Sequence, residues 1–361
     1  MKAKHTATLT RIRQTCCLGL PSRQFMPMVI AQLREMIPCA VGQFAWSSET
    51  GRITNFWSDT FMPRRLAWIV LHHKRYDEDS GNSFRDIVLF GDLTGNAKRM
   101  WARGFEHSGT YAAVFKPYGY KWMLDGVVRD GQRPYGCFAL IRRDTDPAFT
   151  PDEEALLAQA LPYVAHAMKV EATRPSRFVS SGRSALVVCR ADGEVLEWSA
   201  RAHELAVYAL LGDLNLDARV GRADNTRADF TDVQPALAAV VAELGTRLRQ
   251  HDTDDMPALV RRNDWGEFVF RAYPLEAARG ERSRRIGVLI EQCVPIEAHL
   301  LARVNATGLS NRQKEVALLS ARGLPNAQIA RQLNLTPQTV KDYFKEIYAR
   351  LQINSHQELL Q

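Results

Sequence analysis

The chain has 361 residues and a formal net charge of +7, with 46% hydrophobic and 24% charged residues. This length is too great for one small core and predicts two or three domains, while the hydrophobic content excludes wholesale disorder. The mild basic excess permits nucleic-acid binding without requiring it. No uninterrupted apolar run reaches the ~18 residues of a membrane span, so we expect no membrane contact.

The N-terminal segment, residues 1–21, is basic and lacks the apolar stretch and small-residue cleavage site of a signal peptide. We therefore expect a cytoplasmic protein. The six cysteines are scattered, without a CxxC pair or the Cys/His spacing of a zinc site. The sequence thus predicts no metal site, and no pattern in it calls for a cofactor.

Residues 22–170 carry the pattern of an antiparallel α+β domain. Two alternating runs flank the turn ETG at 49–51, and two more flank DGQRP at 130–134, so each pair predicts a β-hairpin. The block closes with a predicted helix. Thr150 is suited to its N-cap, and Glu153, three residues later, completes a capping box.

The next stretch, residues 171–184, is rich in Ser, Arg, Pro and Gly and is typical of a linker. Residues 185–300 then predict a second antiparallel α+β domain. A hairpin turns on Asp192-Gly193, helices follow, and three strand-like runs come last.

Residues 301–361 predict an all-helical domain. Ser310 and Gln313 form a capping box, Asn326 is the expected cap of a short helix, and Thr336 caps the helix that Pro337 opens. Apolar residues recur along one side of that last helix, and polar and basic residues occupy the other. Two helices joined by a tight turn, the second with a basic outer face, indicate a helix-turn-helix.

The segment LSNRQKEVALLSARGLPNAQIARQLNLTPQTVKDYFKEIYARLQINSHQEL, residues 309–359, resembles the LuxR-type (GerE-like) DNA-binding domain without a gap. The matching positions are Glu315, Gly323, Asn326, Ile329, Ala330, Leu333, Thr339, Val340, Lys341, Ile347, Leu351 and Leu359. The resemblance implies four helices, a third helix that enters the major groove of double-stranded DNA, and homodimers that use the fourth helix to bind an inverted repeat.

The DNA-contacting residues that we expect are Asn326, Thr336, Gln338, Thr339, Lys341, Asp342 and Lys345. Asp342 departs from the family, which more often has a neutral or basic residue there. A carboxylate costs affinity near phosphates, but in the major groove it accepts a hydrogen bond from cytosine N4. It is also placed to pair with Lys341 or Lys345.

Upstream, residues 22–170 resemble a GAF-type sensory domain and residues 185–300 a PAS-type domain. The expected fold is thus multidomain: two α+β antiparallel-sheet sensory domains followed by the all-α four-helix domain. A sensor needs a largely apolar pocket with a few polar groups. The expected pocket residues are Trp57, Trp101, Arg103, His107, Tyr111, Phe115 and Trp122, although any single aromatic residue among them is better explained as part of the core.

These features favour a DNA-binding transcriptional regulator with a small-molecule effector and a possible contact with RNA polymerase. Two alternatives stay open: control by a protein partner, and a quorum-sensing autoinducer receptor. An enzyme is not expected, because no P-loop, GxSxG or dinucleotide fingerprint occurs and no residues suggest catalysis.

Overall fold

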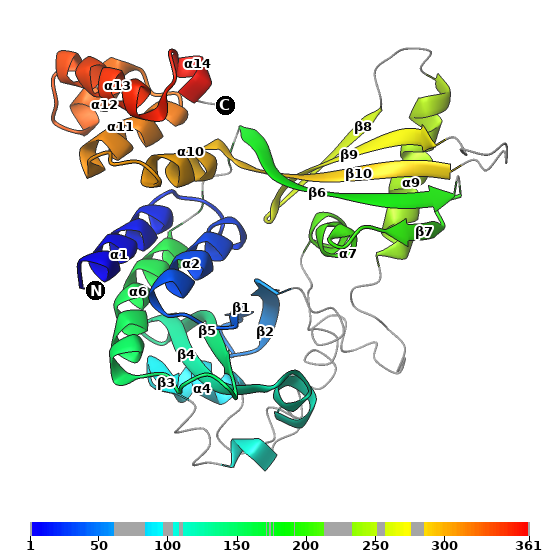
Figure 1. Cartoon of the computed structure of the whole chain (residues 1–361), viewed down its shortest axis with the longest axis horizontal. Coiled ribbons are helices and arrows are strands. Elements are labelled where there is room, and N and C mark those ends of the chain that lie inside the picture. The colour runs from blue at the N-terminus through cyan, green and yellow to red at the C-terminus, as the bar shows by residue number, and fades with distance from the viewer. Residues whose placement is uncertain are drawn as a thin grey trace.

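The computed structural model describes residues 2–60, 84–96, 104–107, 111–170, 172, 175, 177–190, 192–212, 233–250, 257–275 and 285–359. Figure 1 shows two antiparallel sheets and a compact group of C-terminal helices. The two sheets and the helical group correspond to the three blocks expected from the sequence. Among the described residues, no helix is both long and apolar enough to cross a membrane.

The first sheet has the strand order β2-β1-β5-β4-β3. Its strands are β1 (Val41–Ser47), β2 (Ile53–Ser58), β3 (Thr94–Asn96), β4 (Tyr120–Asp130) and β5 (Arg133–Arg143). Both predicted hairpins are present, as the antiparallel pairs β1–β2 and β4–β5. Strand β1, from the start of this block, pairs with β5, from its end, so the block forms one unit.

Helices cover both faces of the first sheet. One face bears α2 (Ser22–Met36) and α6 (Pro151–Lys169). The other bears α4 (Phe84–Phe90) and the short turns η1 (Phe105–His107), η2 (Tyr111–Phe115) and η3 (Lys116–Tyr118). The predicted capping box of α6 is confirmed. The Thr150 hydroxyl accepts a hydrogen bond from the Glu153 backbone N–H, and the Glu153 carboxylate accepts one from the Thr150 backbone N–H. Glu153 also pairs with Arg142 of β5, which fixes the start of α6 against the sheet.

Residues 2–21, which we expected to lie in a separate basic segment, pack against this unit. They contain helix α1 (Lys2–Cys16), which packs against α2 and α6. Its inner face is formed by Thr8, Ile12 and Thr15, all nearly fully buried. Because two of these three are threonines, the helical period shows only weakly in the sequence.

The second sheet repeats the connectivity of the first, with the order β7-β6-β10-β9-β8. Its strands are β6 (Phe178–Arg190), β7 (Val195–Trp198), β8 (Ala258–Asn263), β9 (Gly266–Leu275) and β10 (Arg285–Pro295). Helix α7 (Ala202–Ala206), the π-turn η4 (Val207–Leu211) and α9 (Gln234–Gln250) pack on one face.

The linker expected over 171–184 is shorter than predicted, because β6 begins at Phe178. The polar residues at the start of β6 form hydrogen bonds within the sheet and do not interrupt the strand. The Ser181 hydroxyl, for example, donates to the Gln292 carbonyl oxygen at 2.6 Å. Arg183 donates to Gln292 Oε1 and forms an ion pair with Glu204 of α7. Composition alone did not reveal these partners, which lie far away in the chain.

Five helices complete the chain: α10 (Ile296–Asn305), α11 (Asn311–Ala321), α12 (Asn326–Gln332), α13 (Pro337–Leu351) and α14 (His356–Leu359). The strand β10 ends at Pro295, and α10 begins at the next residue, so the second sheet runs directly into the helical group. Helix α10 also crosses the expected domain boundary between residues 300 and 301.

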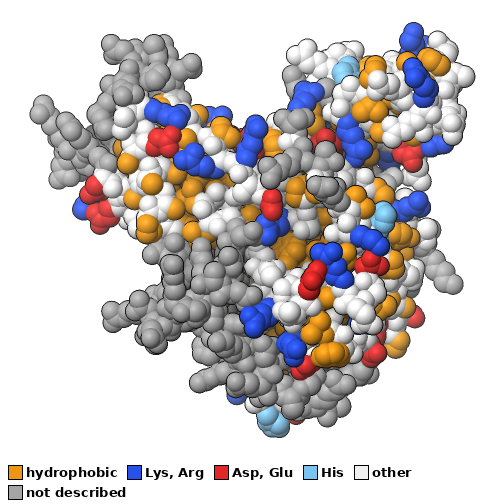
Figure 2. Space-filling model, turned by 180° about the vertical axis from the view of Figure 1, so that it is seen from behind, with side chains coloured by type: hydrophobic (Ala, Val, Ile, Leu, Met, Phe, Trp, Pro, Cys, Tyr) orange, Lys and Arg blue, Asp and Glu red, His pale blue; other side chains and the backbone are white. Residues whose placement is uncertain are grey.

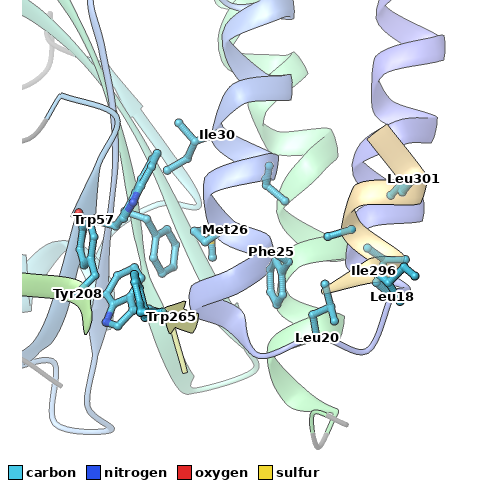
Figure 3. Packing of buried hydrophobic residues seen from close by; sticks show 14 of the residues in the cluster. Leu18, Leu20, Phe25, Met26, Ile30, Trp57, Tyr208, Trp265, Ile296 and Leu301 are labelled. Carbon is cyan, nitrogen blue, oxygen red and sulfur yellow. The ribbon is translucent and has the colours of Figure 1, made fainter. Parts of the chain in front are cut away.

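The three parts pack together through one hydrophobic core. Figure 3 shows Leu18 and Leu20, from the turn after α1, beside Ile296 and Leu301 of α10. The Arg322 guanidinium at the end of α11 donates to the Leu18 carbonyl oxygen at 2.7 Å. The helical domain therefore lies directly on α1.

A separate aromatic contact joins the two sheets. Trp265, in the β8–β9 turn, packs edge-on against Trp46 of β1 at 5.7 Å and lies 4.5 Å from the Tyr208 ring. Arg23 of α2 forms an ion pair with Asp264, the residue before Trp265, at 2.6 Å. We call these five residues the aromatic joint.

Candidate nucleic-acid interface

Helix α13 forms where the sequence predicted it. The Thr336 side chain accepts a hydrogen bond from the Thr339 backbone N–H, and Pro337 occupies the first turn. Val340, Phe344 and Ile347 are buried. Each such apolar side chain contributes about 1.5–3 kcal/mol when it leaves water, so this stripe fixes which side of α13 faces outward.

Helices α11 and α12 support α13 from below. The capping box of Ser310 and Gln313 is present, and the Gln313 amide also donates to Glu346 of α13. Gly323 has a φ of +80°, a conformation that favours glycine, and turns the chain from α11 toward α12. Asn326 is not the cap that we predicted: Pro325 holds that position, and Asn326 is the first residue of α12.

The outer face of α13 carries most of the predicted DNA-contacting residues. Thr336, Gln338, Lys341, Asp342 and Lys345 are exposed, and Thr339 is partly buried beneath them. The structure thus brings these six residues to one surface of one helix. No described part of the chain covers the exposed five.

Asp342 is held by two neighbours on its own helix. Its Oδ1 atom accepts from the Gln338 amide at 3.1 Å and from Lys345 Nζ at 3.2 Å. Of the two lysines considered from the sequence, the partner is therefore Lys345. Among the described residues, Lys341 forms no ion pair, so its charge is available to an external anion.

A shallow hollow of about 510 Å³ adjoins this surface and brings Asn326 of α12 together with the two lysines. Its lining consists of Ser320, Gly323, Leu324, Pro325, Asn326, Lys341, Phe344, Lys345, Tyr348 and His356. Sequence reasoning missed His356 and Tyr348; the signal for Tyr348 was its spacing of four residues from Phe344. Figure 2 shows Lys and Arg side chains over this domain, at the upper right.

The described members of the predicted ligand pocket lie on both faces of the first sheet. Trp57 and Trp122 belong to the large core on the α2–α6 side of the first sheet. Phe115 and Tyr111 pack in a small cluster on the opposite face, and His107 is largely exposed to solvent. Two further predicted residues, Trp101 and Arg103, lie outside the described residues.

No group of three or more His, Cys, Asp or Glu side chains in the described parts of the chain is close enough to hold a metal ion. The described cysteines are all free. Burial raises the pKa of the Cys39, Cys189 and Cys293 thiols to about 11, and these groups therefore remain protonated at neutral pH. They behave as small apolar side chains.

A short helix, a tight turn and a longer capped helix with a basic outer face define a helix-turn-helix domain. Residues 307–361 match the family described as bacterial regulatory proteins, luxR family (GerE). This part of the chain is therefore a LuxR-family DNA-binding domain.

The transcriptional activator protein ExaE of Pseudomonas putida is 42% identical over 53 residues, which are 15% of this chain and a quarter of that protein. A solved structure, the E. coli DhaR(N)-DhaL complex, aligns over 79% of this chain and 89% of the other. Its TM-score is 0.23 and its identity 12%, so it carries no argument about the fold.

Proposed function

We propose that the protein is a DNA-binding transcriptional regulator that reads its operator with α13. The observation that carries this proposal is the uncovered outer face of α13, with its two lysines, on a domain of the LuxR family. The P. putida relative is named a transcriptional activator, which supports a role in transcription. As in the family, contact with RNA polymerase would follow operator binding in the cytoplasm.

We further propose that the active form is a homodimer on an inverted repeat, with α14 at the pairing surface, as the family resemblance implies. The outer face of the second sheet supports self-association. Leu186 of β6 is 42% exposed and Val260 of β8 is 47% exposed on that face, so both apolar side chains are open to contact with a second chain.

The two sheet units are proposed to be sensory domains, the first GAF-like and the second PAS-like. Their shared strand order supports two copies of one architecture. The direct step from β10 to α10 supports transmission, because a shift of this strand must move the helix that carries the DNA-binding domain. A ligand controls such a protein only if it binds two arrangements with different affinity.

The test is the salt dependence of DNA binding by the full chain. A bound sequence is first selected from a random duplex pool, and its affinity is then measured by fluorescence anisotropy at several salt concentrations. Lys341→Ala should weaken binding and flatten the logarithmic salt slope by about 0.9, the value for one lost phosphate contact. Lys345→Ala should act in the same direction.

Lys116→Ala provides the matched control, because it removes an equal charge from an exposed site on η3 of the first unit. Its salt slope should equal that of the wild-type chain. An unchanged slope in both α13 variants, or an equal change in the control, would refute the assignment of α13 as the DNA-reading helix.

A further inference from the structure

The first sheet presents three rows of side chains on the face that looks away from α2 and α6. The row at one end consists of Val41, Ile141 and Met123, which neighbour one another across β1, β5 and β4. Phe105 of η1 and Phe115 of η2 pack on this row. This end of the face is apolar and covered.

The row at the other end is also apolar. It consists of Ala45, Cys137 and Val127, again neighbours across the same three strands. Val88 of α4 is fully buried against Val127 and Cys137. Covered apolar rows therefore border the middle of the face on both sides.

The middle row is polar. Ser58 pairs with Gln43, Gln43 with Ala139, and Ala139 with Asp125, in register across β2, β1, β5 and β4. We call these four residues the polar row. Ala139 lies in the central strand, where a small side chain between two layers is normally buried, yet it keeps partial exposure. The described elements that cover the two apolar rows thus leave Ala139, at the centre of the middle row, partly exposed.

Two members of the polar row are largely buried, and neither side chain has a partner among the described residues. Asp125 is 6% exposed and Gln43 is 8% exposed, and neither side chain forms a hydrogen bond or an ion pair in the described structure. Ser58 Oγ accepts only from the Thr60 backbone N–H, at 3.3 Å. Burial raises the pKa of the Asp125 carboxyl to about 7, so it is ionised in part at neutral pH.

The polar atoms of these two side chains are not among the fully buried ones, so they keep some contact with solvent. A carboxylate that is largely withdrawn from water without a partner still costs free energy. The carboxylate also has an effect on its neighbour, since together with burial it raises the pKa of the Cys137 thiol. Among the described residues, no basic side chain pairs with it. The other residues of the three rows are Val41, Ala45, Met123, Val127, Cys137, Ala139 and Ile141, all apolar.

We propose that the polar row binds the cationic nitrogen of a small organic ligand, an ammonium or amidinium group, through Asp125, Gln43 and Ser58. The row offers mainly acceptors, which suits a head group that carries several N–H donors. The two apolar rows flank this position and suit an apolar ligand body. The inference rests on the sensory role proposed above and names the effector class for the first unit.

The proposal is tested by the melting temperature of the full chain, without DNA, in the presence of two matched pairs of probes. Benzylamine and benzamidine carry a cationic nitrogen; benzyl alcohol and benzamide are their neutral counterparts. The cationic members should raise the melting temperature at millimolar concentration, and the neutral members should not. Asp125→Asn should weaken this response at least tenfold in apparent Kd, which corresponds to about 1.4 kcal/mol.

Asp144→Asn is the control, because it removes the same charge from an exposed site just after β5. It should leave the response to the cationic probes unchanged. Equal stabilisation by neutral and cationic members, or no stabilisation by either cation, would overturn the proposal. DNA affinity of the same preparations reports on α13 independently, so failure of the ligand site and failure of the DNA-binding function are distinguishable.

The stability of the unliganded variant distinguishes a ligand group from a structural one. Asp125→Asn keeps the shape of the side chain and removes a buried charge without a partner, so the unliganded melting temperature should rise. A fall in that temperature would show that the carboxylate supports the fold and would overturn its assignment as a ligand group.

Discussion

At the residue scale, Asp342 has a defined geometry before any DNA arrives. One carboxylate oxygen accepts hydrogen bonds from both the Gln338 amide and the Lys345 ammonium group. Asp342 therefore orients two other side chains of the outer face. All three side chains are solvent-exposed, and such a pair adds little to stability. Its effect is therefore on the arrangement of donors and acceptors that a base pair would meet.

We predict that Asp342→Asn changes base preference more than overall affinity. The amide has one oxygen acceptor in place of two and carries no charge, so the ion pair with Lys345 is lost and discrimination at a cytosine position should fall. Sequencing of duplexes selected from a random pool measures this. Lys341→Ala is the contrast, with lower affinity and an unchanged preference. An equal increase in the affinity of Asp342→Asn for all DNA sequences would show that the carboxylate only repels phosphate.

At the element scale, two hairpins turn on glycines with left-handed φ, in different surroundings. Gly131, between β4 and β5, has a φ of +58° and no atom within 4 Å of the position of an added Cβ. Gly193, between β6 and β7, has a φ of +90°, and an added Cβ would lie 2.6 Å from Ala238 Cα. The second turn therefore sets how closely α9 approaches its sheet.

We predict that Gly193→Ala destabilises the protein more than Gly131→Ala. Both substitutions incur the backbone cost of about 1 kcal/mol for a left-handed alanine. Only Gly193→Ala also forces α9 away from its sheet, which adds about 1–3 kcal/mol to the loss of stability. Urea unfolding of the two variants measures the difference. Equal losses of unfolding free energy would show that α9 gives way without cost.

Elements with strong local signals were predictable from the sequence. The capping residues Thr150, Ser310 and Thr336 all occupy the positions expected, because a cap depends on neighbours three residues away. Helix α1 and the first residues of β6 were not predictable. Their stability comes from α2, α6 and β10, which the sequence does not place beside them.

The same distinction applies to the sites. The proposed DNA-contacting face lies on one helix, and its period is visible in the sequence. The predicted aromatic pocket was assembled from composition, and the sheet divides Trp57 from Phe115 between its two faces. The polar row needs the register of four strands. Asp125 and Gln43 stand in apolar strands, but only their pairing through Ala139 shows that they share a face.

At the scale of the whole molecule, the aromatic joint connects the two sheet units. Trp265 is 5% exposed; it contacts the rings of Trp46 and Tyr208, and its indole N–H donates to the Gly212 carbonyl oxygen at 2.9 Å. Trp265 is therefore anchored in the second unit and reaches the first through Trp46, beside the Arg23–Asp264 ion pair.

We predict that Trp265→Ala separates the melting of the two units. Loss of a buried tryptophan costs about 3–5 kcal/mol, and here much of that loss falls on the contact between units. Differential scanning calorimetry should then show two transitions where the wild-type chain shows one. Trp198→Ala, at the 40% exposed tryptophan of β7, is the control. A single transition in both variants would mean that other contacts couple the units.

The contact between Leu18 and Arg322 also has a consequence for biosynthesis. The two residues are 304 positions apart, so at about 5–20 residues per second a ribosome needs about 15–60 s to make the second after the first. During that interval the turn after α1 has none of its α10 and α11 neighbours, and Leu18 and Leu20 stay open to water or to a chaperone. The helices of the DNA-binding domain, which are translated after α1, thus also complete the hydrophobic core around α1.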